Sequence, residues 1–159
     1  MAMYNLVRLG LAGAAFVWGS LALPAVAGGG PDGGVTAQEV AGVMRARKMA
    51  VAVTTDKDGD PLINSTVGST KFKVYFYQCK GPRCGSIQFS AGFEGAENIT
   101  VSKVMDWNRT KRFGRAYIDK GTLYVEMDMD VEHGTNTEAL ANNFARWGAL
   151  VEQFPKFFK

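Results

Sequence analysis

The stretch KFKVYFYQCKGPRCGSIQFSAGF, residues 71–93, predicts the centre of the fold. In its first half every second residue is apolar, and lysines and tyrosines fill the positions between them. The second half repeats the alternation with serines and a glutamine at the polar positions. A period of two predicts strands with one buried face, here over residues 71–78 and 86–93. The apolar positions are Phe72, Val74, Phe76, Ile87, Phe89, Ala91 and Phe93.

The two cysteines in this stretch constrain how its strands pair. If Cys79 lies opposite Cys84, antiparallel pairing places Phe76 opposite Ile87, and Val74 opposite Phe89 in the same register. The register that closes a disulfide therefore also collects the apolar side chains on one face. Two independent constraints agree, and they predict a β-hairpin.

Further helices and strands are predicted on both sides of this hairpin. Before it, the capping box Thr36-Ala-Gln-Glu39 predicts a helix that ends near Lys48. Strands at 51–55 and 62–67 follow, joined by the turn 56–61. After the hairpin we expect a helix over 101–112, strands at 115–119 and 122–131, and a last helix after Thr137. The buried side of the 101–112 helix is predicted from Val101, Val104, Met105 and Trp107, and Pro155 is expected to end or bend the last helix.

The predicted order of elements is α-β-β-β-β-α-β-β-α. Each predicted strand has one apolar and one polar face, so the helices should all cover the same face of the sheet. The sequence therefore predicts an α+β fold, a two-layer sandwich in which an antiparallel sheet carries its helices on one face.

The beginning of the chain has the pattern of a signal peptide. Arg8 precedes an apolar run over residues 9–23, and Ala25-Val-Ala27 has the small-residue form that signal peptidase accepts. The run is about 15 residues long against the roughly 20 of a membrane span, although a retained anchor stays an alternative. We expect cleavage after Ala27, a signal peptide at 1–27, a glycine-rich linker at 28–34, a domain at 35–159, and a periplasmic or secreted protein.

Composition and cysteine use exclude several classes of function. The 159 residues suffice for one domain, and the net charge of +3 gives no argument for nucleic-acid binding. Four residues separate Cys79 from Cys84, which does not fit a C-x-x-C redox motif, and further zinc ligands are missing. We expect a structural disulfide in an oxidising compartment, with no metal and no cofactor.

The tyrosines are the most informative candidates for a binding site. Strand parity places every tyrosine after residue 35 on the polar face of the sheet, and the strand phenylalanines on the other. A two-residue turn also sets Arg115 opposite Glu126. Tyrosine is enriched in recognition surfaces, but a solvated face stiffened by cross-strand aromatic pairs explains the same pattern. The candidate partner-binding tyrosines are Tyr75, Tyr77, Tyr117 and Tyr124.

Charged residues supply weaker candidates. Arg109, Arg112 and Arg115 lie around the end of the helix predicted at 101–112, where cations offset the helix dipole or bind an acidic partner. Asp128, Asp130 and the single histidine, His133, are the only basis for an enzyme, and no triad can be assembled from them. The aspartates of Asp56-Lys-Asp-Gly-Asp-Pro61 depart from a calcium-binding loop and fit a hairpin turn.

Four runs carry a resemblance to a known family: D-K-D-G-D-P at 56–61, V-Y-F-Y-Q-C at 74–79, I-Q-F-S-A-G-F at 87–93, and W-N-R-T-K-R-F-G-R-A-Y at 107–117. They resemble the YbjN family, labelled putative bacterial sensory transduction regulators, over about Val35 to Phe158. The resemblance implies a fold similar to type III secretion chaperones, which bind protein segments. It implies no catalytic residues, and the signal peptide sets this chain apart from cytoplasmic members.

These observations favour an exported, non-catalytic protein that binds a protein or peptide partner in a regulatory, adaptor or chaperone-like role. A homodimer is compatible with the sequence, whereas nucleic acid and a stable membrane span after cleavage are not expected. Two alternatives stay open. One is a periplasmic enzyme that uses Asp128, Asp130 or His133. The other is a stress-related structural protein without a dedicated ligand.

Overall fold

The computed structural model describes residues 33–159, and the predicted signal peptide lies outside the described residues. The element order is the predicted one. The helices are α1 (Ala37–Ala46), α2 (Val101–Thr110) and α3 (Thr137–Phe157). The strands are β1 (Ala52–Thr55), β2 (Pro61–Val67), β3 (Thr70–Lys80), β4 (Arg83–Glu94), β5 (Arg115–Asp119) and β6 (Thr122–Asp130).

The six strands form one antiparallel sheet in the order β1-β2-β3-β4-β6-β5. The predicted hairpin register is confirmed, because Val74 pairs with Phe89, Phe76 with Ile87, and Cys79 with Cys84. Cys79 and Cys84 form a disulfide. The long strands β3, β4 and β6 make up the middle of the sheet, so their two faces decide what the protein buries and what it presents.

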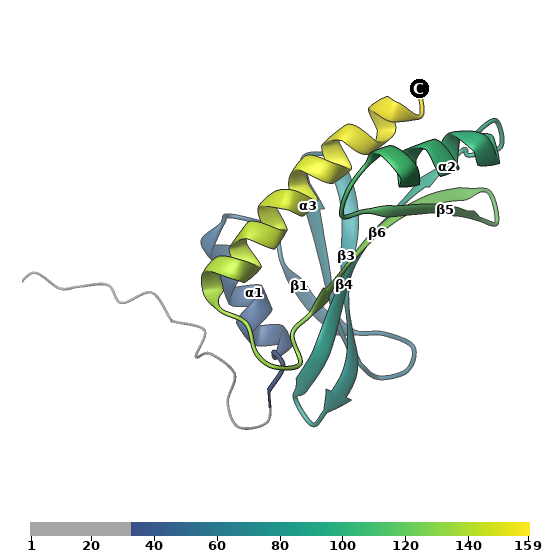
Figure 1. The fold of residues 1–159 in the computed structure, drawn as a ribbon. Coiled ribbons are helices and arrows are strands. Elements are labelled where there is room, and N and C mark those ends of the chain that lie inside the picture. The colour runs from purple at the N-terminus through teal and green to yellow at the C-terminus, as the bar shows by residue number, and fades with distance from the viewer. Residues whose placement is uncertain (1–32) are drawn as a thin grey trace, which may run out of the picture.

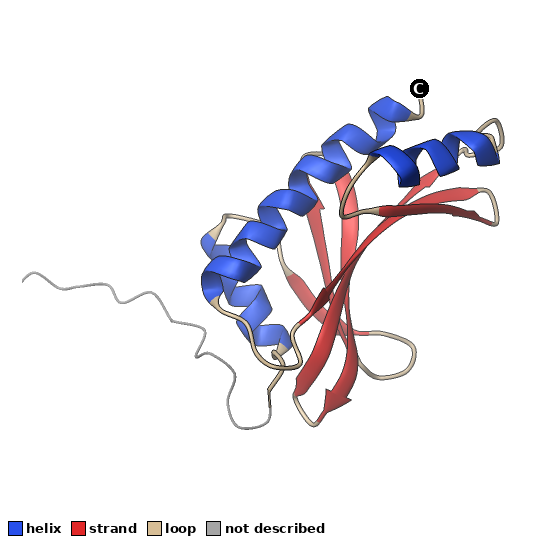
Figure 2. Cartoon of the chain, viewed as in Figure 1, coloured by secondary structure: helices blue, strands red, loops and turns tan. Residues whose placement is uncertain are grey.

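All three helices lie on one side of the sheet (Figures 1 and 2), which confirms the predicted two-layer α+β sandwich. The core between the layers is aromatic. Phe89 contacts both Phe144 and Trp147 of α3, with ring centroids 5.1 and 5.6 Å apart, and Trp107 of α2 meets Phe154 at 4.7 Å. Burial of such side chains supplies the main driving force for folding.

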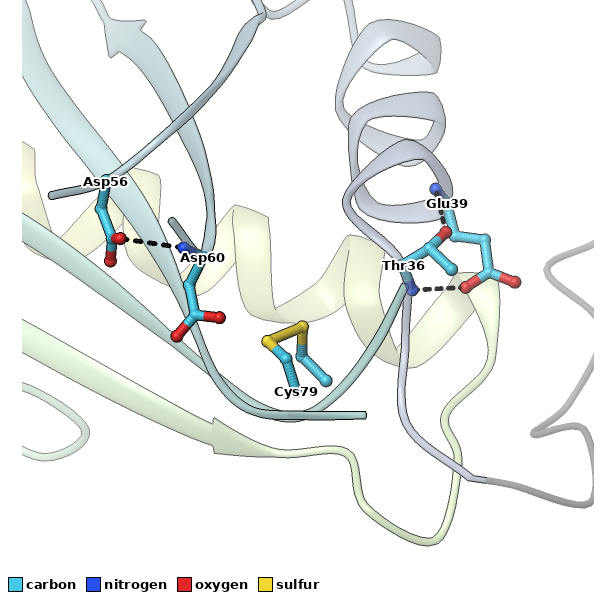
Figure 3. The surroundings of a disulfide bond; sticks show 6 residues. Thr36, Glu39, Asp56, Asp60 and Cys79 are labelled. Carbon is cyan, nitrogen blue, oxygen red and sulfur yellow. Dashed lines mark hydrogen bonds between the residues drawn. A yellow bond between two sulfur atoms is a disulfide. The ribbon is translucent and has the colours of Figure 1, made fainter. Parts of the chain in front are cut away.

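The predicted capping box of α1 and the predicted turn at 56–61 are both formed. The Thr36 hydroxyl accepts from the backbone N–H of Glu39, and the Glu39 carboxylate accepts from the N–H of Thr36 at 2.7 Å. The Asp56 carboxylate accepts from the N–H groups of Asp58 and Asp60, so this run is a β1–β2 turn and not a calcium loop. Figure 3 shows the capping box and the Asp56–Asp60 bond near the disulfide.

The predicted burial of two residues of α2 is wrong. Val101 and Met105 are 72% and 65% exposed, because α2 buries only the narrow stripe of Val104 and Trp107, which faces β5 and the end of α3. Pro155 lies inside α3, which continues to Phe157, and the bend predicted at this residue stays a prediction.

Candidate functional site

The face of the sheet away from the helices is the candidate site. Figure 1 shows that the sheet is curved, and that β5 and the β1–β2 turn both extend to the right, away from α1. The predicted tyrosines lie on this face, with Tyr77 and Tyr117 exposed and Tyr75 and Tyr124 half-buried. They form two stacked pairs. The ring centroids of Tyr75 and Tyr77 are 6.4 Å apart, and those of Tyr117 and Tyr124 are 5.2 Å apart.

At the β5–β6 end of this face, hydrogen bonds converge on the buried carboxylate of Glu126. Arg115 donates to its Oε2 at 2.6 Å, as the predicted pairing requires, while Tyr117 donates to Oε1 at 2.8 Å and Ser90 donates at 3.3 Å. The hydrogen bond to Glu126 raises the pKa of Arg115. Burial, with this same carboxylate, raises the pKa of Tyr117. The network ties Tyr117 to the sheet.

The β3–β4 end is held by two hydrogen bonds that run through the side chain of Gln88. The Tyr77 hydroxyl donates to Gln88 Oε1 at 3.2 Å, and the Gln88 amide donates to Asp128 at 2.9 Å. Burial raises the pKa of Tyr77, and the nearby carboxylate of Glu126 adds to this rise. Tyr75 makes no side-chain hydrogen bond within residues 33–159; its ring stacks on Tyr77, and the ammonium of Lys73 lies 5.9 Å from the ring centroid.

One ring from each pair, Tyr75 and Tyr124, lines a groove of about 670 Å³, the tyrosine groove. Its floor is formed by the small residues Ser90 and Gly92 of β4, and Tyr75 and Tyr124 stand beside it. A β-carbon at Gly92 would lie 2.9 Å from the ring of Tyr124, so the glycine lets that ring close over the backbone. Other lining residues come from the segment before β2 and from neighbouring strands: Ala50, Val51, Ala52, Asn64, Ser65, Thr66, Lys71, Phe72, Lys73, Glu94 and Thr122.

The groove carries cations that the described part of the chain does not neutralise. Lys71 and Lys73 of β3 are exposed, and neither forms an ion pair with any residue of 33–159. Glu94 lines the same groove. The groove therefore offers aromatic surface together with charges of both signs.

The predicted basic set does not form one site. Arg115 lies on the tyrosine-bearing face, bound to Glu126, and Arg109 pairs with Asp106 of its own helix at 2.9 Å. Arg112 has neither partner, and its guanidinium lies 4.8 Å from the centroid of the Phe113 ring. The arginines are close in sequence, which is why they form one predicted set. Because the chain turns between the end of α2 and β5, their side chains contact different neighbours.

The residues considered for catalysis are not assembled into a site. Asp128 accepts from Gln88, the Asp130 carboxylate accepts from the backbone N–H of Glu132, and His133 is exposed in the loop after β6. Within residues 33–159 there is no group of acidic, histidine or cysteine side chains that could hold a metal ion. Among the helices of the same residues, none is long and apolar enough to cross a membrane.

The run Trp107–Tyr117 contains contacts that the sequence did not predict. The Trp107 indole donates to the carbonyl of Gly114 at 2.9 Å. The Asn108 side chain both donates to and accepts from the backbone of Ala116, so it pairs with the open edge of β5. A β-carbon at Gly114 would collide with Leu150 of α3. This run therefore docks α2 on β5 and protects the sheet edge.

Fold and site together define a two-layer α+β domain whose free sheet face, rather than a catalytic cluster, is its best-formed site. The chain belongs to the YbjN family, whose model, described as "Putative bacterial sensory transduction regulator", matches residues 36–159. Neither the search of curated proteins nor that of solved structures gave a match. The likeness to type III secretion chaperones stays a prediction.

Proposed function

We propose that this chain is an exported YbjN protein that binds an extended segment of a protein partner in the tyrosine groove. The family description supports a regulatory, non-catalytic role. The observation that carries the proposal is the groove itself, because a hollow of about 670 Å³ with two aromatic walls lies on the only helix-free face of the described sheet.

The chemistry of the groove favours a peptide over a small cofactor. Tyr75 and Tyr124 offer flat apolar surfaces with polar edges, which suit aromatic or aliphatic side chains of a partner. Lys71 and Lys73 on one wall, with Glu94 also in the lining, match a segment of mixed charge. The lining extends from the segment before β2 across β3 and β4 to β6, so an extended chain can lie across these strands.

The test selects peptides from a displayed library on the full-length protein and measures their dissociation constants by calorimetry. Replacing Tyr75 and Tyr124 with serine should weaken binding at least about tenfold, because aromatic anchors dominate such interfaces. Tyr77→Ser is the matched control, since Tyr77 lies on the same face but does not line the groove.

Two results would contradict the proposal. If no peptide is enriched, the face is a solvated surface, and the protein has a structural role without a dedicated ligand. If peptides bind but the double variant binds them equally well, the groove is not the site. Sedimentation of the free protein shows separately whether a second copy is the partner.

Export is a separate part of the proposal. The disulfide is compatible with an oxidising compartment, and the pattern of residues 1–27 is that of a signal peptide. N-terminal sequencing of the protein from a periplasmic extract should begin at Gly28. A protein that starts at Met1, or that stays with the membrane fraction, would contradict cleavage after Ala27.

A further inference from the structure

The family-specific run Trp107–Tyr117 contains a segment that the fold does not explain. Trp107, Asn108 and Gly114 dock α2 on its neighbours. Arg109 pairs with Asp106, and Arg115 and Tyr117 bind Glu126. The segment Lys111-Arg112-Phe113 is left without an ion pair or a side-chain hydrogen bond to any described residue. It lies on the helix side of the domain, away from the tyrosine groove.

Phe113 has a backbone conformation that a phenylalanine rarely adopts. Its φ is +72°, in the left-handed region that favours glycine, and its side chain is 51% exposed. Glycine is the residue that adopts this conformation without strain. A strained and exposed aromatic residue points to a use for the ring other than stability.

Cations surround this ring from two elements. The guanidinium of Arg112 lies 4.8 Å from the ring centroid, and that of Arg146 from α3 lies 4.2 Å from it. Lys111 stands on the same side, 5.9 Å from the centroid of Trp107. Within residues 33–159 none of the three forms an ion pair with a carboxylate. Their mutual repulsion would be relieved by an anion from outside.

A hollow opens at this point. It measures about 200 Å³ and is walled by apolar atoms of Trp107, Phe113 and Leu150, while all three cations line it. The remaining lining residues are Ala149 and Gln153. The lining contains no acidic side chain.

We propose that this hollow is a second binding site, which takes an acidic peptide segment of a protein partner. One apolar side chain would fill the hollow, and flanking carboxylates would pair with Arg112, Arg146 and Lys111. Arginine on an aromatic ring is held in place for such pairs, because the ring fixes its plane. The hollow favours a peptide over an anionic membrane, since a flat bilayer cannot enter a concave site of one side chain's size.

The test uses a labelled peptide with one leucine between pairs of glutamates, titrated with the full-length protein by fluorescence anisotropy. R112Q/R146Q should weaken binding about tenfold or more, since two charge-assisted contacts are removed. R109Q is the matched control, because Arg109 is an exposed arginine at the end of the same helix that already pairs with Asp106. The glutamine analogue of the peptide should not bind.

A second variant separates binding from folding. F113G removes the ring but relieves the left-handed backbone, so its melting temperature should be equal to or above that of the wild type, while peptide binding is lost. A clear fall in melting temperature would make Phe113 a structural residue and overturn this explanation of the strain.

Three other outcomes overturn the proposal. They are equal binding of the glutamate and glutamine peptides, equal binding by R112Q/R146Q and wild type, and binding of phosphatidylglycerol vesicles without binding of the peptide. The proposal does not depend on the tyrosine groove, because Tyr75→Ser/Tyr124→Ser should bind this peptide as the wild type does.

Discussion

The two tyrosine pairs on the free sheet face have the same position in the strand pattern but different surroundings. Tyr117 and Tyr124 stack at 5.2 Å, and the Tyr117 hydroxyl binds the buried carboxylate of Glu126. Tyr75 and Tyr77 lie 6.4 Å apart, and the Tyr77 hydroxyl binds the neutral amide of Gln88 at the longer distance of 3.2 Å. The first pair is tied into a charged network, and the second is held loosely.

This difference teaches which aromatic residues are free to serve a partner. A ring that is hydrogen-bonded and stacked stabilises the sheet, and a partner has to bind without displacing it. A ring that has no hydrogen bond and is only loosely stacked can repack against an incoming side chain at little cost. Tyr75 stacks on Tyr77 at 6.4 Å, whereas Tyr124, on the other side of the groove, stacks more closely, at 5.2 Å from Tyr117.

The largest expected effect comes from breaking the charged network. Glu126→Ala should lower the free energy of unfolding by about 3 kcal/mol, because it leaves the donors of Arg115, Tyr117 and Ser90 without their acceptor. The value is at the low end for a buried pair, since the Arg115 side chain is 63% exposed and can be rehydrated. Urea denaturation measures it.

Asp128→Ala is the matched control on the same strand and face. Asp128 is exposed and accepts one hydrogen bond from Gln88, so its removal should cost less than about 1 kcal/mol. If Glu126→Ala and Asp128→Ala lower the free energy of unfolding equally, the two ends of the face do not differ in their contribution to stability.

The disulfide, which joins β3 to β4, should have the next largest effect. Cys79→Ala/Cys84→Ala should lower the free energy of unfolding by about 2 kcal/mol, as the chain-entropy model gives for so short a loop. Alkylation of the native wild-type protein should label no thiol. Two readily labelled cysteines would contradict the disulfide.

Single tyrosine substitutions compare the two pairs directly. Tyr124→Ser should cost about 1 kcal/mol, because the ring stacks on Tyr117 and covers Gly92. Tyr75→Ser should stay within about 0.5 kcal/mol. Thermal and urea unfolding of both variants check the difference, and a larger loss for Tyr75→Ser would reverse the assignment of roles.

The hairpin register and the Arg115–Glu126 pair could be predicted because each depends on local rules. The cysteine spacing and the apolar alternation of residues 71–93 demand the same pairing, and a two-residue turn leaves one register for β5 and β6. Both constraints act between neighbouring strands of a hairpin, where sequence distance and spatial distance agree.

The rest depends on contacts between distant elements. Arg146 reaches Phe113 only because α3 crosses the domain beside α2, and no sequence pattern gives that angle. The predicted burial of Val101 and Met105 is wrong, because helical spacing shows which residues share one side of the helix. It does not show how wide a surface packs against that side. The groove follows from small residues at 90 and 92, which alternation alone does not distinguish from other polar positions.

The smallest expected effect is a difference in alkaline stability. Burial and the Glu126 carboxylate raise the pKa of Tyr117 above its unfolded value, so the fold prefers the neutral phenol. This stabilisation is fully present below the unfolded pKa of about 10 and is lost as the pH rises through the folded pKa. From about pH 9 to pH 11 the urea midpoint of the wild type should therefore fall more steeply than that of Tyr117→Phe, which cannot ionise there.

Tyr77→Phe is the control. Its urea midpoint should diverge less from that of the wild type, since the hydroxyl of Tyr77 meets the neutral Gln88 amide. Parallel curves for wild type and Tyr117→Phe would show that the bond to Glu126 does not distinguish the two pairs.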